Sequence, residues 1–203
     1  MKNVLFMPKF TLPIQKPPMT EILLVCTANR CRSVMAEALL ARRLRSTSHA
    51  VIRARSAGLL RDGEAPPAEV MSVIAGYGID VSRHRSRAVS GEELLAASLI
   101  VAMTREQLRE IAVRAPAAWR RAFTLKELVR RGESLGSRLA DQSLADWLDG
   151  AHAGRDRMTL LGDSADDDIA DPFGGPLSGY VATAALLDDL LARLVRLCWP
   201  LSA

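Results

Sequence analysis

The chain has 203 residues, 49% of them hydrophobic and 25% charged, which is typical of one globular domain with a single core. Its net charge is +4, but the basic residues are spread along the whole sequence and aromatic residues make up only 4%, so this charge does not indicate a nucleic-acid-binding protein. Three cysteines are an odd number for a disulfide framework and predict free thiols in a reducing cytoplasm.

The first 20 residues predict a flexible extension that precedes a domain at 21–203. They lack a sustained hydrophobic period and contain Pro8, Pro13, Pro17 and Pro18. The short apolar run after Lys2 stops at Pro8 and no small-residue cleavage site follows it, so no export signal is indicated. No segment is long and apolar enough to predict insertion into a membrane.

Strands and helices are predicted to alternate after this extension. The apolar run from Ile22 to Val25 is typical of a strand buried on both faces of a parallel sheet, and helical composition begins at Ser33. The predicted elements that follow are strands at 51–55, 98–103 and 122–125 and helices at 66–77 and 104–113. This order predicts an α/β fold with a three-layer doubly wound sheet of about four parallel strands flanked by helices.

The pattern weakens between 132 and 168, which predicts an insertion. It contains one candidate short helix at 144–148 and the acidic sequence DSADDD at 163–168, which is typical of a solvated loop. A final helix is predicted from Tyr180 to Cys198, because apolar residues recur there at helical spacing on one face. That spacing places Cys198 in the core.

The turn between the first strand and the first helix has the sequence CTANRCRS, from Cys26 to Ser33. Consecutive backbone N–H groups in such a turn, with the helix N-terminus, form a concave anion site. The same field favours a thiolate at Cys26, which is a nucleophile for phosphorus, and the planar guanidinium of Arg32 can hold two phosphate oxygens at once. The sequence therefore predicts a phosphate-binding loop after the first strand, formed by Thr27, Ala28, Asn29, Arg30, Cys31 and Ser33.

A zinc site is the competing interpretation of the two cysteines in this turn. It would combine Cys26 and Cys31 with His49, His84 or His152, but no C-x2-C pair supports it. We therefore expect neither a metal nor a cofactor.

The segment VCTANRCRSVMAEALL at 25–40 resembles the signature of the low-molecular-weight protein tyrosine phosphatase family, in its bacterial form. Further matching segments occur in the family's order at 56–58, 78–80, 84–87, 102–104, 123–129 and 171–174. The resemblance covers about 21–197 apart from the predicted insertion. It implies hydrolysis of phosphomonoesters on proteins through a cysteinyl-phosphate, and it suggests an autophosphorylating tyrosine kinase as a partner.

The resemblance also implies roles for single residues. Asp171, before Pro172, corresponds to the general acid that protonates the leaving oxygen, and Phe173 is the one obvious residue for a substrate wall. Cys31 corresponds to a second cysteine that captures the oxidised nucleophile as a disulfide. The residues implied to brace the phosphate loop are Asn29, Ser33, Ser56 and His84.

The sequence departs from the family pattern at Ala28, where glycine is usual, at Val34, where proline is usual, and at Arg30. Arg30 borders the expected pocket mouth and matches neither the Ile common in tyrosine phosphatases nor the Thr of arginine phosphatases. A protein-arginine phosphatase on the same scaffold is therefore an alternative, favoured by FTLKELV and DPFGG.

An arsenate reductase-like oxidoreductase is a further alternative. It would need two more cysteines near the middle of the chain, where there is none. A non-catalytic phosphate-binding module would be expected to lack Cys26 or Asp171.

Overall fold

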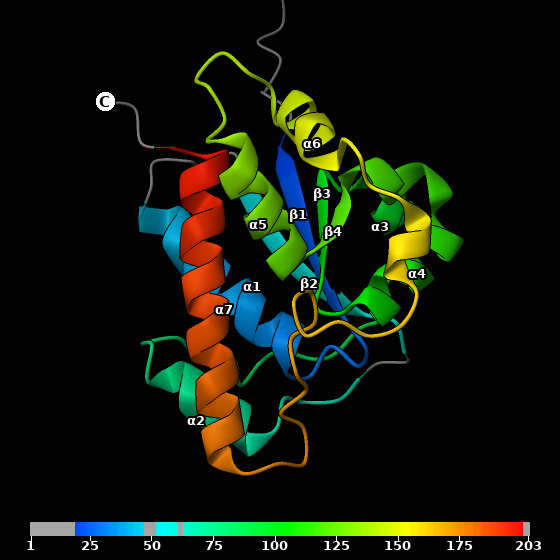
Figure 1. The fold of residues 1–203 in the computed structure, drawn as a ribbon. Helices are drawn as coiled ribbons and strands as arrows, with labels where there is room; N and C mark the ends of the chain where they lie inside the picture. The colour runs from blue at the N-terminus through cyan, green and yellow to red at the C-terminus, as the bar shows by residue number, and fades with distance from the viewer. Residues whose placement is uncertain (1–18, 47–51, 61–62, 201–203) are drawn as a thin grey trace, which may run out of the picture.

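The computed structural model describes residues 19–46, 52–60 and 63–200 (Figure 1). Four parallel strands form one sheet in the order β2-β1-β3-β4. The strands are β1 (Thr20–Cys26), β2 (Ile52–Gly58), β3 (Leu99–Ala102) and β4 (Ala122–Thr124). The predicted α/β class and the four-stranded parallel sheet are confirmed.

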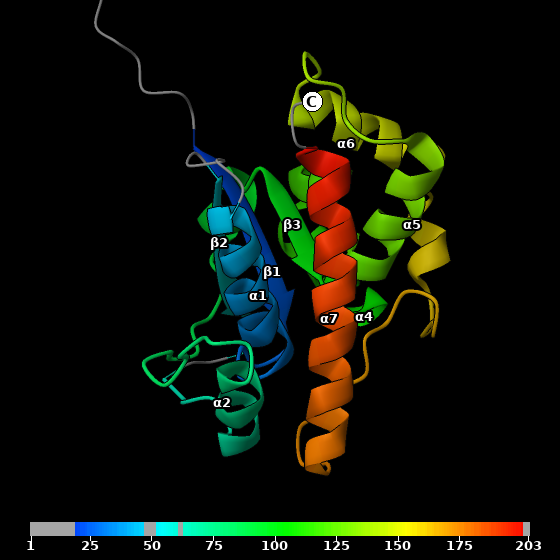
Figure 2. The same cartoon turned by 90° about the vertical axis from the view of Figure 1, so that its left-hand side faces the viewer.

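Helices cover both faces of this sheet and make it the middle of three layers (Figures 1 and 2). Because side chains alternate along a strand, Ile22 and Leu24 of β1 enter the core on one face and Leu23 and Val25 the core on the other. The first face is covered by α1 (Arg32–Ser46), α2 (Ala68–Ala75), α5 (Leu125–Leu135), α6 (Leu144–His152) and α7 (Leu177–Cys198). The second is covered by α3 (Gly91–Ala96), α4 (Arg105–Arg114) and the 3-10 helix η1 (Pro116–Arg121).

The predicted elements occur with shifted ends, and four helices of the described residues were not predicted: α3, α5, η1 and a second 3-10 helix, η2 (Arg157–Leu160). Helix η2 lies within the stretch of weak pattern. That 132–168 is an insertion stays a prediction, but part of it belongs to the core, since Trp147 of α6 is 1% exposed. Cys198 is fully buried as expected.

The prediction of a solvated loop at 163–168 is wrong for Asp167. This residue is 4% exposed, because Arg105 and Arg130 form ion pairs with its carboxylate.

The predicted extension at 1–20 lies, apart from its last two residues, outside the described part of the chain. Within the described ranges, no helix combines the length and apolar character that crossing a membrane requires.

Candidate active site

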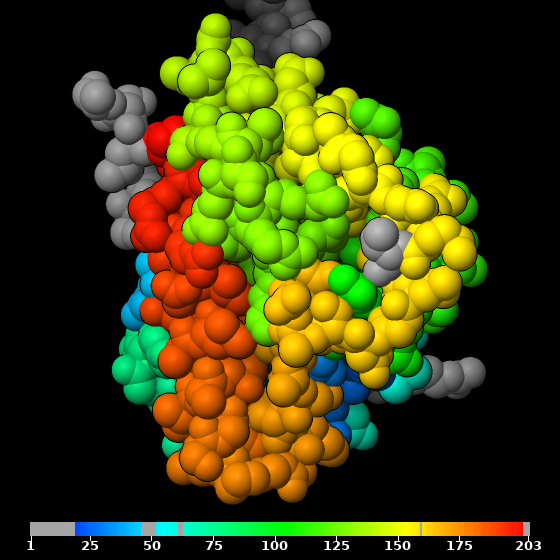
Figure 3. Space-filling model, viewed as in Figure 1, coloured from blue at the N-terminus to red at the C-terminus, as the bar shows by residue number. Residues whose placement is uncertain are grey.

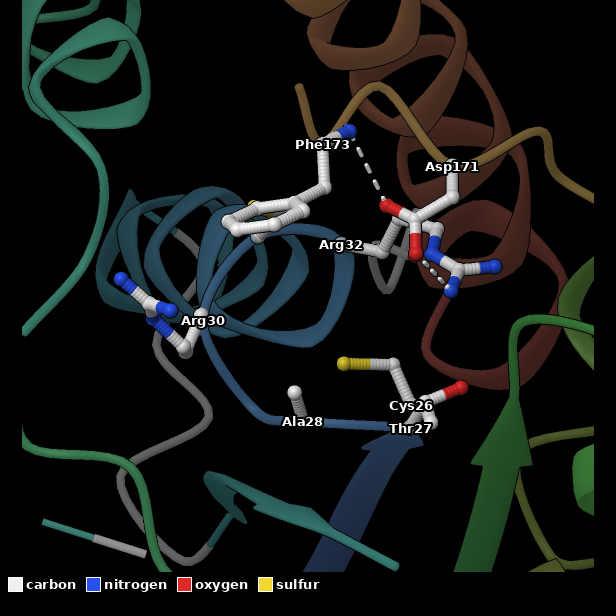
Figure 4. A pocket seen from close by; sticks show the side chains of 8 residues that line it. Cys26, Thr27, Ala28, Arg30, Arg32, Asp171 and Phe173 are labelled. Carbon is white, nitrogen blue, oxygen red and sulfur yellow. Dashed lines mark hydrogen bonds and ion pairs between the residues drawn. The ribbon is translucent and has the colours of Figure 1, made fainter. Parts of the chain in front are cut away.

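The predicted catalytic residues meet in one pocket at the carboxyl end of β1 (Figure 4). Its floor is the turn that joins β1 to α1, and its opposite wall is the segment before α7, which is 137 or more residues away in sequence. The residues that line it are Cys26, Thr27, Ala28, Arg30, Cys31, Arg32, Asp171 and Phe173.

The sulfur of Cys26 lies at the base of this pocket and takes part in two hydrogen bonds. The backbone N–H of Asn29 donates to it at 3.3 Å, and the Ser33 hydroxyl lies 3.0 Å from it. The Ser33 oxygen already accepts a hydrogen bond from the Asn29 side-chain amide at 2.9 Å, so its own proton is free to point at the sulfur. Donors that converge on one sulfur stabilise negative charge there.

Asn29 shapes the loop from within. It is fully buried and is the one residue other than glycine with positive φ, 53°, in the described part of the chain. Asparagine tolerates this left-handed conformation better than most residues other than glycine. Ala28 does not require positive φ, so the missing glycine at that position causes no strain.

The Asn29 side chain connects the loop to two neighbouring elements. Its amide nitrogen also donates to Ser56 at the end of β2, at 2.8 Å, while its amide oxygen accepts from the Arg87 N–H at 3.1 Å. Its backbone oxygen lies 2.9 Å from Nε2 of His84, which must carry the proton because a carbonyl only accepts. These hydrogen bonds join Asn29 to Ser33, Ser56 and His84, and the role of the four residues in bracing the phosphate loop stays a prediction.

Three supporting residues were not assigned a role from the sequence. Glu37 of α1 accepts a 2.5 Å hydrogen bond from the Ser56 hydroxyl, and the Gln107 amide of α4 donates to the Thr27 hydroxyl at 3.0 Å. Gly58, at the end of β2, lets the backbone of the phosphate loop pack directly against it, since a Cβ there would lie 2.9 Å from the Thr27 carbonyl oxygen. Glu37 and Gly58 fall within the matched segments, whereas nothing in the local sequence marks Gln107.

Arg32 presents one edge of its guanidinium to the pocket. The side chain is 6% exposed; Nη1 donates to the Ile169 carbonyl at 3.1 Å, and Nη2 contacts Oδ2 of Asp171 at 2.5 Å. Nε is buried without a partner among the described residues. Nε and Nη2 share the edge that fits two oxygens of one phosphate, so the unpaired Nε–H is a donor placed for an anion.

The segment that carries Asp171 forms the wall above the sulfur. Oδ1 of Asp171 accepts from the Phe173 N–H at 3.3 Å, and the carboxyl group is 46% exposed. The Tyr180 hydroxyl accepts from the Gly174 N–H at 3.2 Å, which ties this turn to α7, and burial raises the pKa of Tyr180. The carboxyl group therefore reaches the pocket from a turn held at both sides.

Arg30 and Phe173 form the mouth of the pocket together. The guanidinium carbon of Arg30 lies 5.2 Å from the centre of the Phe173 ring, within cation–π distance. Nε of Arg30 donates to the Ala65 carbonyl at 3.1 Å, and Glu64 lies 4.0 Å from the guanidinium. These contacts hold the Arg30 guanidinium against Phe173 and the segment of Glu64 and Ala65.

Cys31 lines the pocket as a neutral thiol at physiological pH. Burial, followed by the nearby charges of Asp171 and Cys26, raises its pKa to about 12. All three cysteines are free and buried. Among the described residues no group of His, Cys, Asp or Glu could hold a metal ion, and His49 of the competing zinc interpretation lies outside them.

Known proteins resemble the chain in sequence and in fold. Residues 21–146 match the family model for low molecular weight phosphotyrosine protein phosphatases. A protein-arginine-phosphatase of Geobacillus stearothermophilus is 31% identical over 86% of this chain and 93% of its own length. A probable low molecular weight protein-tyrosine-phosphatase EpsP of Ralstonia solanacearum is 42% identical over 53% of this chain and 71% of its own length.

Solved structures agree with the sequence matches. The YwlE arginine phosphatase from Geobacillus stearothermophilus superposes with a TM-score of 0.64 over 87% of this chain and 91% of its own, at 31% identity. A low molecular weight protein tyrosine phosphatase from T. tengcongensis gives a TM-score of 0.66 over 87% of this chain and 98% of its own, at 28% identity.

Proposed function

The chain belongs to the low molecular weight phosphotyrosine protein phosphatase family, and from that membership we propose that it hydrolyses phosphotyrosine in proteins through a cysteinyl-phosphate. The observation that carries this proposal is that Cys26 and Arg32 line one pocket and that Nε of Arg32 has no partner among the described residues. These two groups supply what phosphoryl transfer needs from a protein: an anion clamp and a nucleophile.

In the first step, the sulfur of Cys26 attacks phosphorus while the bond from phosphorus to the tyrosine oxygen breaks. The loop N–H groups and the Nε and Nη2 edge of Arg32 hold the phosphate oxygens as charge spreads over them. An incoming phosphate dianion competes with Asp171 for Nη2 of Arg32, which frees the carboxyl group to turn toward the leaving oxygen. Asp171 then gives its proton to the leaving phenolate oxygen.

In the second step, water attacks the phosphorus of the cysteinyl-phosphate and the sulfur leaves as a thiolate. Asp171, now a carboxylate, accepts the proton of the attacking water, which restores the acid for the next cycle. The hydrogen bonds from Ser33 and from the Asn29 N–H stabilise the departing thiolate. Phosphate is the product.

The pocket mouth supports phosphotyrosine over phosphoarginine. A tyrosine ring can pack on Phe173, which is 56% exposed, and it carries no charge toward Arg30. The guanidino group of phosphoarginine is cationic and would face the Arg30 guanidinium. The same charge favours acidic residues beside the phosphotyrosine.

Protein-arginine phosphatase activity is the second candidate. It is supported by the 31% identity to a protein-arginine-phosphatase over 93% of that protein's length. Arsenate reductase-like chemistry has less support, because Cys198 is fully buried at the far end of α7 from the phosphate loop (Figure 1).

The substrates that fit this site are phosphorylated proteins, and we place the enzyme in the cytoplasm with an autophosphorylating tyrosine kinase as its partner. The similarity to EpsP, a probable protein-tyrosine-phosphatase, supports phosphotyrosine proteins as the substrates.

Initial rates on phosphotyrosine, phosphoarginine and phosphoserine peptides, measured side by side, test the proposal. We expect phosphotyrosine to be the best substrate and phosphoserine the poorest. Absence of hydrolysis of all three would refute phosphatase function, whereas a preference for phosphoarginine would refute only the choice of substrate.

A further inference from the structure

The loop before the candidate acid is held by a buried carboxylate between two arginines. Nε of Arg105, at the start of α4, and Nη2 of Arg130, on α5, both lie 2.7 Å from the Asp167 carboxylate. The Asp167 side chain is 5% exposed. The yellow-orange segment that carries this loop lies directly against the green surface of α5 in the space-filling view (Figure 3).

This carboxylate is ionised and fully paired. Burial alone would raise its pKa, but the hydrogen bonds from Arg130 and Arg105 outweigh burial and hold the pKa of Asp167 below its ordinary value. A buried charge with two charge-assisted hydrogen bonds fixes its backbone far more firmly than a solvated surface pair would.

The backbone that follows Asp167 continues directly into the active site. Asp168 accepts from the first N–H of α4 at 2.7 Å, and the Ile169 N–H donates to the Met103 carbonyl at the end of β3 at 2.8 Å. The Ile169 carbonyl in turn accepts from Nη1 of Arg32. Only one residue then separates Ile169 from Asp171, so the position of the acid depends on where this backbone is held.

We propose that Asp167 is a positioning residue for Asp171: its clamp between Arg105 and Arg130 sets the path of residues 167–169 and thereby places the acid over the scissile oxygen. This inference rests on the proposed function. The two ion pairs of Asp167 would then affect proton transfer only through the position of Asp171, and Asp167 would not touch the substrate. Asp167 itself does not line the pocket.

The test is leaving-group dependence in the full-length protein. Asp167→Asn removes the charge and keeps the shape, and we expect it to lower kcat/KM about tenfold for phosphotyrosine, a poor leaving group, but less than about threefold for p-nitrophenyl phosphate. Asp166→Asn is the matched control, since Asp166 is the exposed neighbour and only its backbone carbonyl is bound, by Arg130. The control should match the parent on both substrates.

A double-mutant cycle separates positioning from general destabilisation. In an Asp171→Asn background, Asp167→Asn should cause no further loss on phosphotyrosine, because the group through which it acts is already removed. If Asp167→Asn does not fold, Arg130→Gln removes one arm of the clamp from a side chain that is 52% exposed. The Arg130→Gln variant should also lose more kcat/KM on phosphotyrosine than on p-nitrophenyl phosphate, but the loss should be smaller than for Asp167→Asn.

The positioning role would be overturned if Asp167→Asn lowered kcat/KM equally on both substrates. It would also be overturned if the kcat/KM losses of Asp167→Asn and Asp171→Asn multiplied in the double variant. Neither result would affect the proposed phosphatase function. If the parent protein hydrolysed neither substrate, the proposed function would fail and this inference with it.

Discussion

Arg30 offers the sharpest test of how the pocket mouth selects its substrate. Its guanidinium carbon lies 5.2 Å from the centre of the Phe173 ring. If a substrate side chain at this mouth carried its charge at about 6 Å from Arg30, the two like charges would repel by about 0.7 kcal/mol in water and about 1.4 kcal/mol at half that dielectric constant. Glu64 offsets part of this repulsion, but it is 67% exposed and its effect is screened.

Replacing Arg30 by threonine should therefore change specificity modestly and in one direction. A repulsion of about 1 kcal/mol corresponds to about fivefold discrimination against a cationic side chain. We expect Arg30→Thr to narrow the ratio of kcat/KM for phosphotyrosine over phosphoarginine by about that factor. Loss of the contact between Arg30 and Phe173 would affect both substrates, so a change in the ratio of the two kcat/KM values reports the effect of the charge of Arg30.

The assay measures both peptides with the parent, with Arg30→Thr and with Arg83→Thr. Arg83 is exposed and does not line the pocket, so its replacement removes the same charge without changing the ratio. In the parent, about 1 M salt should erode the discrimination, because it shortens the screening length to about 3 Å. A kcat/KM ratio unchanged in Arg30→Thr, or a parent that prefers phosphoarginine, would show that the charge of Arg30 does not select the substrate.

Three further predictions concern the pocket itself. Asp171→Ala should lower kcat/KM by about 10²–10⁴ for phosphotyrosine and much less for p-nitrophenyl phosphate; the same pattern from Asp168→Ala instead would show that the acid is wrongly assigned. Cys26→Ser should abolish turnover and keep vanadate binding by calorimetry, because the loop N–H groups do not depend on the sulfur; residual turnover above a trace would contradict the role of Cys26. Peroxide should inactivate the enzyme reversibly, and Cys31→Ser should make the loss permanent. Since the Cys31 pKa is near 12, its thiolate fraction and the rate of disulfide formation should rise about tenfold per pH unit between pH 7 and 9. Peptide mapping that pairs Cys26 with Cys198 would exclude this protective role.

The sheet and the phosphate loop could be predicted because their signals are local. The apolar run of β1 is buried on both faces, so its composition alone indicates a central parallel strand. The spacing from Cys26 to Arg32 spans the whole turn, and the anion site depends mainly on backbone N–H groups of that turn. Asp171 is different, because the family resemblance and the following Pro172, rather than a local pattern of chemistry, distinguished it from its acidic neighbours.

Helix α5 was missed although its apolar residues Leu125, Leu128 and Val129 have helical spacing. Its glycine, Gly132, suggested the start of an irregular stretch. The structure shows why glycine is needed, since a Cβ there would lie 2.9 Å from the Trp147 ring of α6. The packing of α5 against α6 requires glycine at position 132, and local helix propensity could not reveal this requirement.

The burial of Asp167 depends on partners that are distant in sequence. Arg105 and Arg130 lie 62 and 37 residues before it. An acidic run is solvated in most chains, and only the fold brings the two guanidinium groups to this one carboxylate.

The covalent intermediate is the claim on which the account most depends. Rapid acid quenching of the parent during turnover of a phosphotyrosine peptide, followed by peptide mass spectrometry, tests it directly. We expect one phosphoryl group on the peptide that contains Cys26, absent in Cys26→Ala and unaffected by Cys198→Ala. Turnover at the parent rate without any phosphorylated cysteine, or with the phosphoryl group on another residue, would contradict it.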